Sequence, residues 1–213
     1  MMQLDPYPAF RSTLKIVCWF MSRKHTEQAI GLVFEKAGIE KLTVGWGVYE
    51  ECQFRHCNFA HANLSNLMFR NCTFDACDMS LAKLGGTGLQ EVRFANCKLL
   101  GITFSDCRKL LLQMEFERCL LKLSVFSGLD LKNTSFVDCD LQEADFTGAN
   151  MSGAAFGNCD LKKALFFHTN LEKADFRTAY NYSISPENNR LRKARFSMHG
   201  IAGLLDAYDI NIE

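Results

Sequence analysis

Large apolar residues recur at every fifth position through the central part of the chain. The series is unbroken over eleven successive positions, which are Leu121, Phe126, Leu131, Phe136, Leu141, Phe146, Met151, Phe156, Leu161, Phe166 and Leu171. The residue two places before most of these centres is small, as at Cys119, Ser124 and Ala144, and the positions between are mostly polar. A short fixed period of this kind predicts a solenoid, in which each repeat packs on its neighbours.

The same phase extends toward the N-terminus and slips once. Centres five residues apart continue as far as Phe104, but the next such position holds Lys109, and the clean series resumes at Phe116. Two additional residues therefore lie within the stretch 105–115, and we take Leu111 as the displaced centre.

A second interruption covers residues 181–190. Asn181 and Pro186 stand at centre positions there, and Leu191 and Phe196 then restore the phase. We expect a loop that bulges from an otherwise regular coil.

Grouping the repeats four to a turn gives a second period of 20 residues. One group contains only phenylalanines, which are Phe54, Phe74, Phe94, Phe116, Phe136, Phe156, Phe176 and Phe196. The small positions of the next group are all cysteines, namely Cys57, Cys77, Cys97, Cys119, Cys139 and Cys159. Because the aromatic and cysteine series show the same period independently, we expect a coil with four sides.

The repeating unit has the form A(D/N)(L/F)xx. It is clearest in the segments 144–148 (Ala-Asp-Phe-Thr-Gly) and 174–178 (Ala-Asp-Phe-Arg-Thr). This motif, found from about Val48 to Phe196, resembles that of the pentapeptide-repeat family. The resemblance implies a mainly β fold, a right-handed quadrilateral parallel β-helix. At a strand spacing of ~4.8 Å, some seven coils would form a rod of roughly 35 Å.

Residues 1–45 lack the repeat and form the expected N-terminal cap segment. Thr26 is a candidate N-cap for a helix that ends at Gly38, because Ala29, Ile30, Val33 and Phe34 form an apolar stripe at helical spacing. Residues 39–44 alternate as a short strand does. We expect the segment to cover the open end or one side of the solenoid, which otherwise exposes apolar surface and a sheet edge.

The repeat region, 46–198, is followed by a C-terminal segment, 199–213. Ile201, Leu204 and Leu205 have helical spacing, and Ile210 and Ile212 have strand spacing. This ending is similar to that of the quinolone-resistance (Qnr) type of pentapeptide-repeat protein. In that type the C-terminal helix joins two rods tail to tail, so the resemblance implies a homodimer with these apolar residues in the contact.

The composition gives no sign of a charged or membrane partner. Lys plus Arg and Asp plus Glu both number 24 among 213 residues, so that no global field favours nucleic acid or an anionic membrane. No stretch approaches the roughly 18 to 20 apolar residues of a membrane span, and the short apolar run at 16–21 lacks the features of a signal peptide. We therefore predict no direct nucleic-acid contact and no membrane contact.

Nine of the ten cysteines lie two residues before a centre or its expected place. A metal site or a redox relay is one interpretation of this series. The favoured interpretation is a buried, reduced thiol that serves as a small apolar residue, because Ala, Ser and Thr occupy equivalent positions. Reduced thiols predict a cytoplasmic protein.

The chain offers no recognisable catalytic constellation, phosphate-binding loop or nucleotide fingerprint. His56, His61 and His168 fall two residues after a centre, which is an outward position without zinc-ligand spacing. We predict a non-enzymatic protein without metal or other cofactor.

An acidic stripe is formed by Asp138, Asp140, Glu143, Asp145 and Asp160. It could imitate the DNA backbone, as proposed for topoisomerase-binding members of the family. Lys162 and Lys163 lie among these acids, and a mimic of DNA would need strong net negative charge. A mixed, solvated face is the favoured interpretation.

Apolar residues at positions expected to face outward are the best candidates for a functional surface. They are Leu81, Leu100, Leu110, Leu112, Leu120, Leu123 and Val125. Contiguous exposed apolar surface indicates a partner or a covering segment, and residues 1–45 could provide the cover.

We expect a protein-interaction module that acts through its outer faces. The alternative implied by the resemblance is a Qnr-like protein that binds DNA gyrase or topoisomerase IV and protects it from quinolones.

Overall fold

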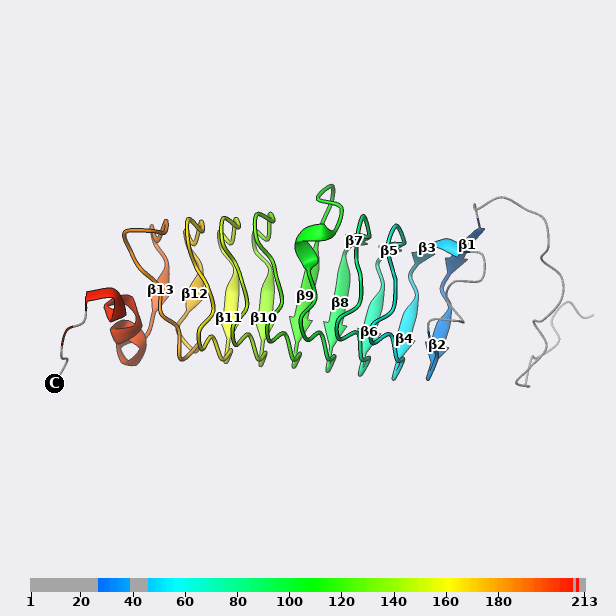
Figure 1. The fold of residues 1–213 in the computed structure, drawn as a ribbon, viewed down its shortest axis with the longest axis horizontal. Coiled ribbons are helices and arrows are strands. Elements are labelled where there is room, and N and C mark those ends of the chain that lie inside the picture. Colours follow the sequence, from blue (N-terminus) through cyan, green and yellow to red (C-terminus); the bar gives the residue numbers. More distant parts are fainter. Residues whose placement is uncertain (1–26, 39–45, 209, 211–213) are drawn as a thin grey trace, which may run out of the picture.

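The computed structural model describes residues 27–38, 46–208 and 210, which wind into a long four-sided coil (Figure 1). The larger of its two sheets contains nine parallel strands in the order β13-β12-β11-β10-β9-β8-β6-β4-β2. Its strands are β2 (Val33–Glu35), β4 (Gln53–Arg55), β6 (Thr73–Asp75), β8 (Val92–Ala95), β9 (Met114–Glu117), β10 (Ser135–Val137), β11 (Ala155–Gly157), β12 (Asp175–Phe176) and β13 (Arg195–Phe196). Nine strands on one side correspond to eight full turns, or ~38 Å at ~4.8 Å per turn.

The smaller sheet forms the neighbouring side of the coil. It contains β1 (Glu27–Ile30), β3 (Trp46–Glu50), β5 (Met68–Arg70) and β7 (Gly88–Gln90), again paired in parallel. Isolated parallel bridges continue the ladders on the remaining sides, as between Asp140 and Asp160. The predicted fold class, a parallel β-helix, is confirmed.

The strand register confirms the 20-residue period. Phe54 pairs with Phe74 and Phe136 with Phe156, whereas Phe94 pairs with Phe116, which is 22 residues further along. All the rings of this ladder from residue 54 to residue 176 are buried and stack face to face, with centroids 4.5–5.3 Å apart. The core is therefore a set of columns in which each side chain rests on its equivalent in the next coil.

A second column of rings packs edge-on against the first. Phe126 lies 5.9 Å from Phe116 with their planes at 82°, and it stacks on Phe146 at 5.2 Å. Aromatic pairs prefer such offset and edge-to-face arrangements because of the ring quadrupole. The two columns thus fit the spacing that the backbone ladders set, and they pack two adjacent sides against each other.

The corners explain the polar part of the repeat. The residue two places after most centres has a left-handed backbone, with φ between 49° and 72°, which turns the chain onto the next side. Asp or Asn just before the centre accepts the backbone N–H just after it, as Asp140 Oδ1 does from Gln142 N–H at 3.0 Å and Asp145 Oδ1 from Thr147 N–H at 2.8 Å. Such side-chain turns satisfy backbone donors at the corner.

The helix predicted through Ala29 and Phe34 is wrong. These residues lie in β1 and β2, which pair with β3 and β4, and Phe34 stacks on Phe54 at 5.0 Å. Both positions continue the five-residue phase backwards, so their spacing of five, not helical periodicity, determines the structure. The strand predicted for 39–44 lies outside the described residues, as do Thr26 and residues 1–25.

The two additional residues of the slip form a loop at 109–112. Arg108 N–H still bonds Thr87 O, and β9 resumes the ladder at Met114, opposite Val92. Leu111 is not the displaced centre, because its side chain is 69% exposed and its φ is +57°. Leu112, predicted to face outward, instead packs partly buried against the core. Just before the loop, Phe104–Asp106 forms the short 3-10 helix η2.

The interruption at 181–190 leaves the coil pairing intact on both sides. Tyr180 bridges to Asp160, and Arg190 bridges to Asn170. Between these two bridges the side chains of Tyr182 and Ile184 are buried. They fill the interior in place of the apolar centre that is missing at Asn181.

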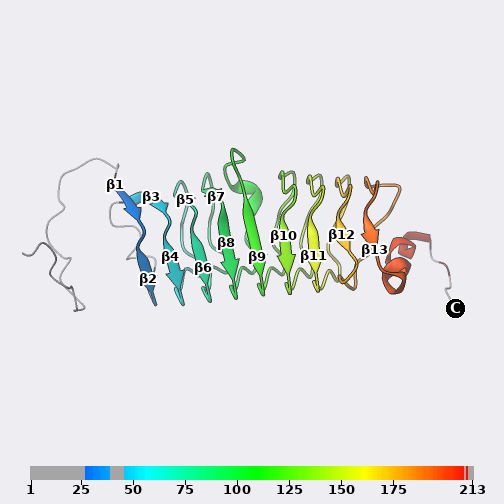
Figure 2. The ribbon, with the colours of Figure 1, turned by 180° about the vertical axis from the view of Figure 1, so that it is seen from behind.

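The C-terminal end is closed by two short 3-10 helices, η3 (Met198–Leu204) and η4 (Asp206–Tyr208) (Figure 2). Leu204 packs partly buried against the core, and Gly203 O accepts the N–H of Ile184 at 2.8 Å. A Cβ at Gly203 would lie 2.1 Å from Tyr182 O, so this position requires glycine. Ile210 is exposed and not part of a strand, and Ile212 lies outside the described residues.

The stacked column makes a quantitative prediction. Phe136→Ala removes a fully buried ring that stacks on both neighbours, and we expect it to lower the free energy of unfolding by about 3–5 kcal/mol. Phe167→Ala, at a half-exposed outward position, should change it by less than about 0.5 kcal/mol. Denaturant unfolding followed by circular dichroism measures both, and equal losses would argue against the column.

Candidate functional site

The structure divides the predicted apolar patch between two places. Five of its members lie around one corner and its two adjoining sides, and we call them the leucine corner, which comprises Leu81, Leu100, Leu120, Leu123 and Val125. Leu81 and Leu123 are corner residues with φ of +57° and +61°, exposed to 50% and 49%. Leu120 and Val125 occupy bridge positions in neighbouring ladders. Leu110 lies in the 109–112 loop, on a different side of the coil.

The leucine corner is continuous along the rod axis. Gly101 lies between Leu81 and Leu123 in the ladder, since Leu81 N–H bonds Leu100 O and Gly101 N–H bonds Lys122 O. A Cβ at Gly101 would lie 2.8 Å from Leu81 Cδ2, so that the leucine side chain covers this glycine. None of the described residues 27–38, which belong to the N-terminal coil, covers the patch.

Further exposed apolar residues lie nearer the C-terminal end and were missing from the predicted patch. They include Leu165, Phe167 and Tyr180. Leu165 and Phe167 flank the buried centre Phe166, so the rule that placed Leu120 and Val125 outward would have identified them. Leu165 continues the ladder of Val125 through Asp145.

The predicted C-terminal contact residues differ in exposure. Ile201 is 45% exposed, whereas Leu204 and Leu205 are half-buried. Leu204 packs against the core, so its first role in the structure is to close the end of the coil.

The six-cysteine series lines the interior of one side. Cys77 Sγ donates to Phe54 O at 3.3 Å, and Cys119 Sγ donates to Phe94 O at 3.4 Å. Thr169 and Ser124 make the equivalent bond from other sides of the coil, at 2.9 and 2.8 Å. Thiols and hydroxyls thus perform the same structural task, which is to satisfy a carbonyl in an adjacent coil.

All nine cysteines in the described ranges are buried and unbonded to one another. Burial raises the pKa of the Cys72 thiol to about 12, and burial together with the nearby Asp106 carboxylate raises the pKa of Cys107 to about 12. Among the described residues no group of three or more His, Cys, Asp or Glu side chains could hold a metal ion. His56, His61 and His168 are exposed corner residues, as predicted.

The acidic stripe consists mainly of carboxylates that stabilise the coil. Three of them accept the backbone N–H two residues further on, and these are Asp140, Asp145 and Asp160. Asp138 accepts from Asn158 Nδ2 at 3.1 Å, and Glu143 pairs with Lys122 at 3.5 Å. These contacts favour a solvated face over an imitation of the DNA backbone.

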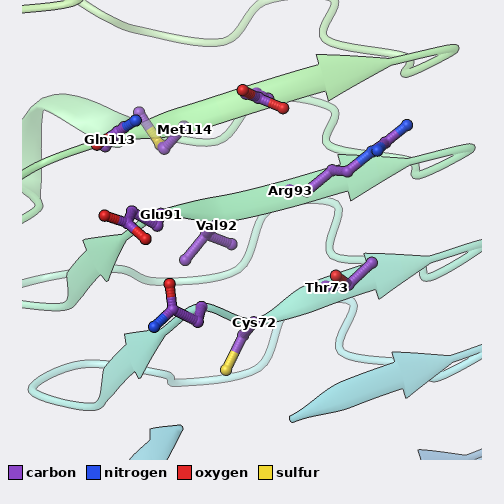
Figure 3. A pocket seen from close by; sticks show the side chains of 9 residues that line it. Cys72, Thr73, Glu91, Val92, Arg93, Gln113 and Met114 are labelled. Atoms are coloured by element: carbon purple, nitrogen blue, oxygen red, sulfur yellow. The ribbon is translucent and has the colours of Figure 1, made fainter. Parts of the chain in front are cut away.

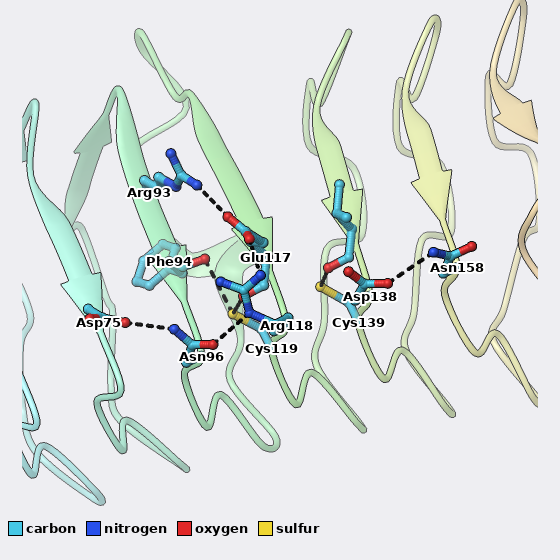
Figure 4. A network of polar contacts seen from close by, with 11 residues as sticks. Asp75, Arg93, Phe94, Asn96, Glu117, Arg118, Cys119, Asp138, Cys139 and Asn158 are labelled. Atoms are coloured by element: carbon cyan, nitrogen blue, oxygen red, sulfur yellow. Dashed lines mark hydrogen bonds and ion pairs between the residues drawn. The ribbon is translucent and has the colours of Figure 1, made fainter.

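A polar network crosses β6, β8 and β9 on the side of the phenylalanine ladder (Figure 4). Asn96 Nδ2 donates to Asp75 Oδ1 at 2.8 Å, and Arg118 Nε donates to Asn96 Oδ1 at 2.8 Å. Glu117 forms ion pairs with both Arg93 and Arg118, and the hydrogen bond from Arg93 is the main cause of its lowered pKa. Its members neutralise one another, so it provides no concentrated charge for a ligand.

An open hollow of about 330 Å³ lies beside this network (Figure 3). Its lining includes Glu91, Arg93 and Glu115 together with Cys72. The Cys72 thiol itself is buried and donates to Tyr49 O and Arg70 O. The hollow therefore has charged walls but presents no activated nucleophile.

Comparison with known proteins agrees with this geometry. The family model described as "Pentapeptide repeat region" matches residues 49–109 and 108–176. No curated protein sequence matches the chain.

Among solved structures, the chain is similar to full-length QnrB1, a plasmid-mediated fluoroquinolone resistance protein, with a TM-score of 0.58 and 16% identity over 86% of this chain and 100% of that one. HetL, a pentapeptide-repeat protein involved in heterocyst differentiation regulation from the cyanobacterium Nostoc sp., matches with a TM-score of 0.33 and 17% identity over 82% of this chain and 90% of its own. At 16% identity the likeness to QnrB1 shows the fold alone. No helix in the described part of the chain is long and apolar enough to cross a membrane.

The cysteine interior predicts a specific pattern of reactivity. At pH 8 the nine described thiols should react with a thiol reagent only after unfolding, because they are buried; at Cys72 and Cys107 a pKa near 12 also leaves almost no thiolate. A Cys18→Ser variant removes the one cysteine outside the described residues. Rapid reaction of several thiols in that folded variant would contradict the structural role.

Proposed function

The chain belongs to the pentapeptide-repeat family, and we propose that it acts as a non-enzymatic, cytoplasmic scaffold that binds a protein partner. The observation that carries this proposal is the leucine corner. Its exposed leucines stand at positions that are polar in the neighbouring coils, where His61, Glu143 and Lys163 occupy the equivalent corner.

Apolar side chains at this corner have no role in the core. Leu81 and Leu123 adopt a left-handed backbone, which is costly for leucine and easily adopted by Asn or Gly. Large apolar residues held in an unfavourable conformation and exposed to water favour burial against another molecule. The rigid ladder keeps them at fixed spacing, so that little entropy is lost on binding.

Capture of partners from a lysate tests this proposal if the variants are matched. Leu81→Asp combined with Leu123→Asp should reduce the amount of the principal bound protein at least tenfold, while the coil stays folded because Asp tolerates positive φ. Leu165→Asp changes an equally exposed leucine further along the rod and should leave the binding unchanged. Equal recovery by all three proteins would refute the leucine corner as the binding surface.

DNA gyrase or topoisomerase IV is the second candidate partner. Two observations favour it: the structural match covers the whole of QnrB1, and a loop projects from the middle of the rod. Addition of the protein to a gyrase supercoiling assay containing ciprofloxacin should then restore supercoiling. No protection, with the folded state verified, would exclude gyrase as the partner and leave the scaffold proposal in place.

Dimerisation through the C-terminal end completes the proposal. Ile201 and Met198 are exposed on η3, beyond the last coil, and could contact the same residues of a second rod. Leu204 packs against the core and closes the end of the coil that carries Ile201 and Met198.

A further inference from the structure

One corner of the coil has a regular charge pattern with Leu111 at its middle. This corner, which we call the Leu111 corner, follows the side that contains β1, β3, β5 and β7. Its nine positive-φ residues, one per coil, are Gly31, Glu51, Asn71, Glu91, Leu111, Asn133, Gly153, Lys173 and Lys193. Leu111 is the fifth of the nine, so four coils lie on each side of it.

The charges are segregated on either side of Leu111. Glu51 and Glu91 precede it, Lys173 and Lys193 follow it, and all four are exposed. Within the described part of the chain none of the four takes part in an ion pair. Each half of the corner therefore presents uncompensated charge to solvent.

The outward residues of the adjoining side extend this separation. In the first four coils, the corner and this side carry Glu50, Glu51 and Glu91 against Arg70. In the last four they carry Lys132, Lys173, Arg190, Arg192 and Lys193 against Asp130 and Glu172. Three acids and one base give −2, and five bases and two acids give +3, on a chain whose overall charge is zero.

The 109–112 loop forms an apolar ridge between the two halves. Leu110 and Leu111 are 77% and 69% exposed, and the loop stands above the neighbouring coils in Figures 1 and 2. A hollow of about 240 Å³ lies on the side of Asn71 and Glu91, and one of about 300 Å³ lies on the side of Lys132. The ridge is therefore an exposed apolar centre between an acidic half and a basic half.

We propose that the Leu111 corner and its adjoining side bind a second copy of this chain, with the two rods side by side and antiparallel. A two-fold axis at Leu111 places the two leucine ridges in contact with each other. Glu51 and Lys173 each lie three coils from Leu111, or ~14 Å at ~4.8 Å per coil. The reversed copy therefore brings Glu51 of each chain against Lys173 of the other, as a self-complementary interface requires.

The self-complementary pattern identifies the occupant. A uniformly acidic partner would fit the second half and be repelled by the first, and a basic partner would have the opposite difficulty. A reversed copy satisfies both halves at once, with an apolar centre and a charged rim, which is the usual arrangement of an interface. This contact is distinct from the end-to-end contact proposed at Ile201.

Sedimentation equilibrium at low ionic strength tests the apolar centre. The wild-type chain should self-associate, and Leu111→Asp should raise the dissociation constant of this contact at least about 30-fold. Leu165→Asp is the control, because Leu165 is also an exposed leucine and belongs to neither the leucine corner nor the Leu111 corner, and it should have no effect. A wild-type monomer, or association abolished by Ile201→Asp but untouched by Leu111→Asp, would overturn the proposal.

Charge reversal tests the orientation. Glu51→Lys and Lys173→Glu should each weaken the association by about tenfold, because each change places like charges together at two symmetric points. The double variant exchanges the two charges and should restore the affinity. Additive losses in the double variant would refute the antiparallel register.

Cross-linking provides a readout that does not depend on affinity. In a Cys18→Ser background, Leu111→Cys places a thiol beside the two-fold axis, and mild oxidation should give a covalent dimer. Leu165→Cys, an exposed position outside both corners, should remain largely uncross-linked. A covalent dimer of Leu165→Cys alone would place the contact elsewhere.

Discussion

The fixed spacing of the parallel backbone ladders is the constraint on which the rest of this structure depends. Each coil must present an inward side chain that fits directly above its equivalent, and the stacked phenylalanines, such as Phe116 between Phe94 and Phe136, meet this requirement. Small inward residues such as Cys119 and Ser124 meet it differently, by donating thiol or hydroxyl groups to carbonyls of an adjacent coil. Because no coil can bury its interior alone, the regular sequence and the fold are closely linked.

This link explains how much could be predicted from the sequence. The period of five, the period of 20 and the jump of 22 residues between Phe94 and Phe116 follow from inward side chains alone, and the register confirms them. The prediction from sequence was wrong at residues that fit both a helical pattern and the five-residue repeat. Ala29 and Phe34 fit both a helix stripe and the repeat, and only the pairing of β1 and β2 with the next coil decides between them.

The surface was harder to predict than the interior. The outward rule identified Leu81 and Leu123 correctly but could not reveal that Leu110 lies on another side, because the position of the two additional residues within 105–115 depends on local hydrogen bonds. Local hydrogen bonds also explain why Leu112 packs against the core and Leu111 is exposed, which is the reverse of the prediction. The charge pattern of the Leu111 corner becomes visible only when residues 20 or 22 apart are aligned along one edge of the coil. The net charge of the whole chain, which is zero, gives no sign of this pattern. In this fold, the regular interior provides rigidity, and the exceptions to the repeat provide the surfaces for recognition.

Hydrogen–deuterium exchange resolved to single amides tests this account most directly, because it reports the ladder and its exceptions in one experiment. The structure predicts slow exchange for the amides of Lys36, Arg108 and Gln113, which bond carbonyls of neighbouring coils. Fast exchange is predicted for Leu110 and Leu111 in the projecting loop. Uniform protection across 105–115, or unprotected amides at Lys36 and Gln113, would contradict a continuous coil from which only this loop departs.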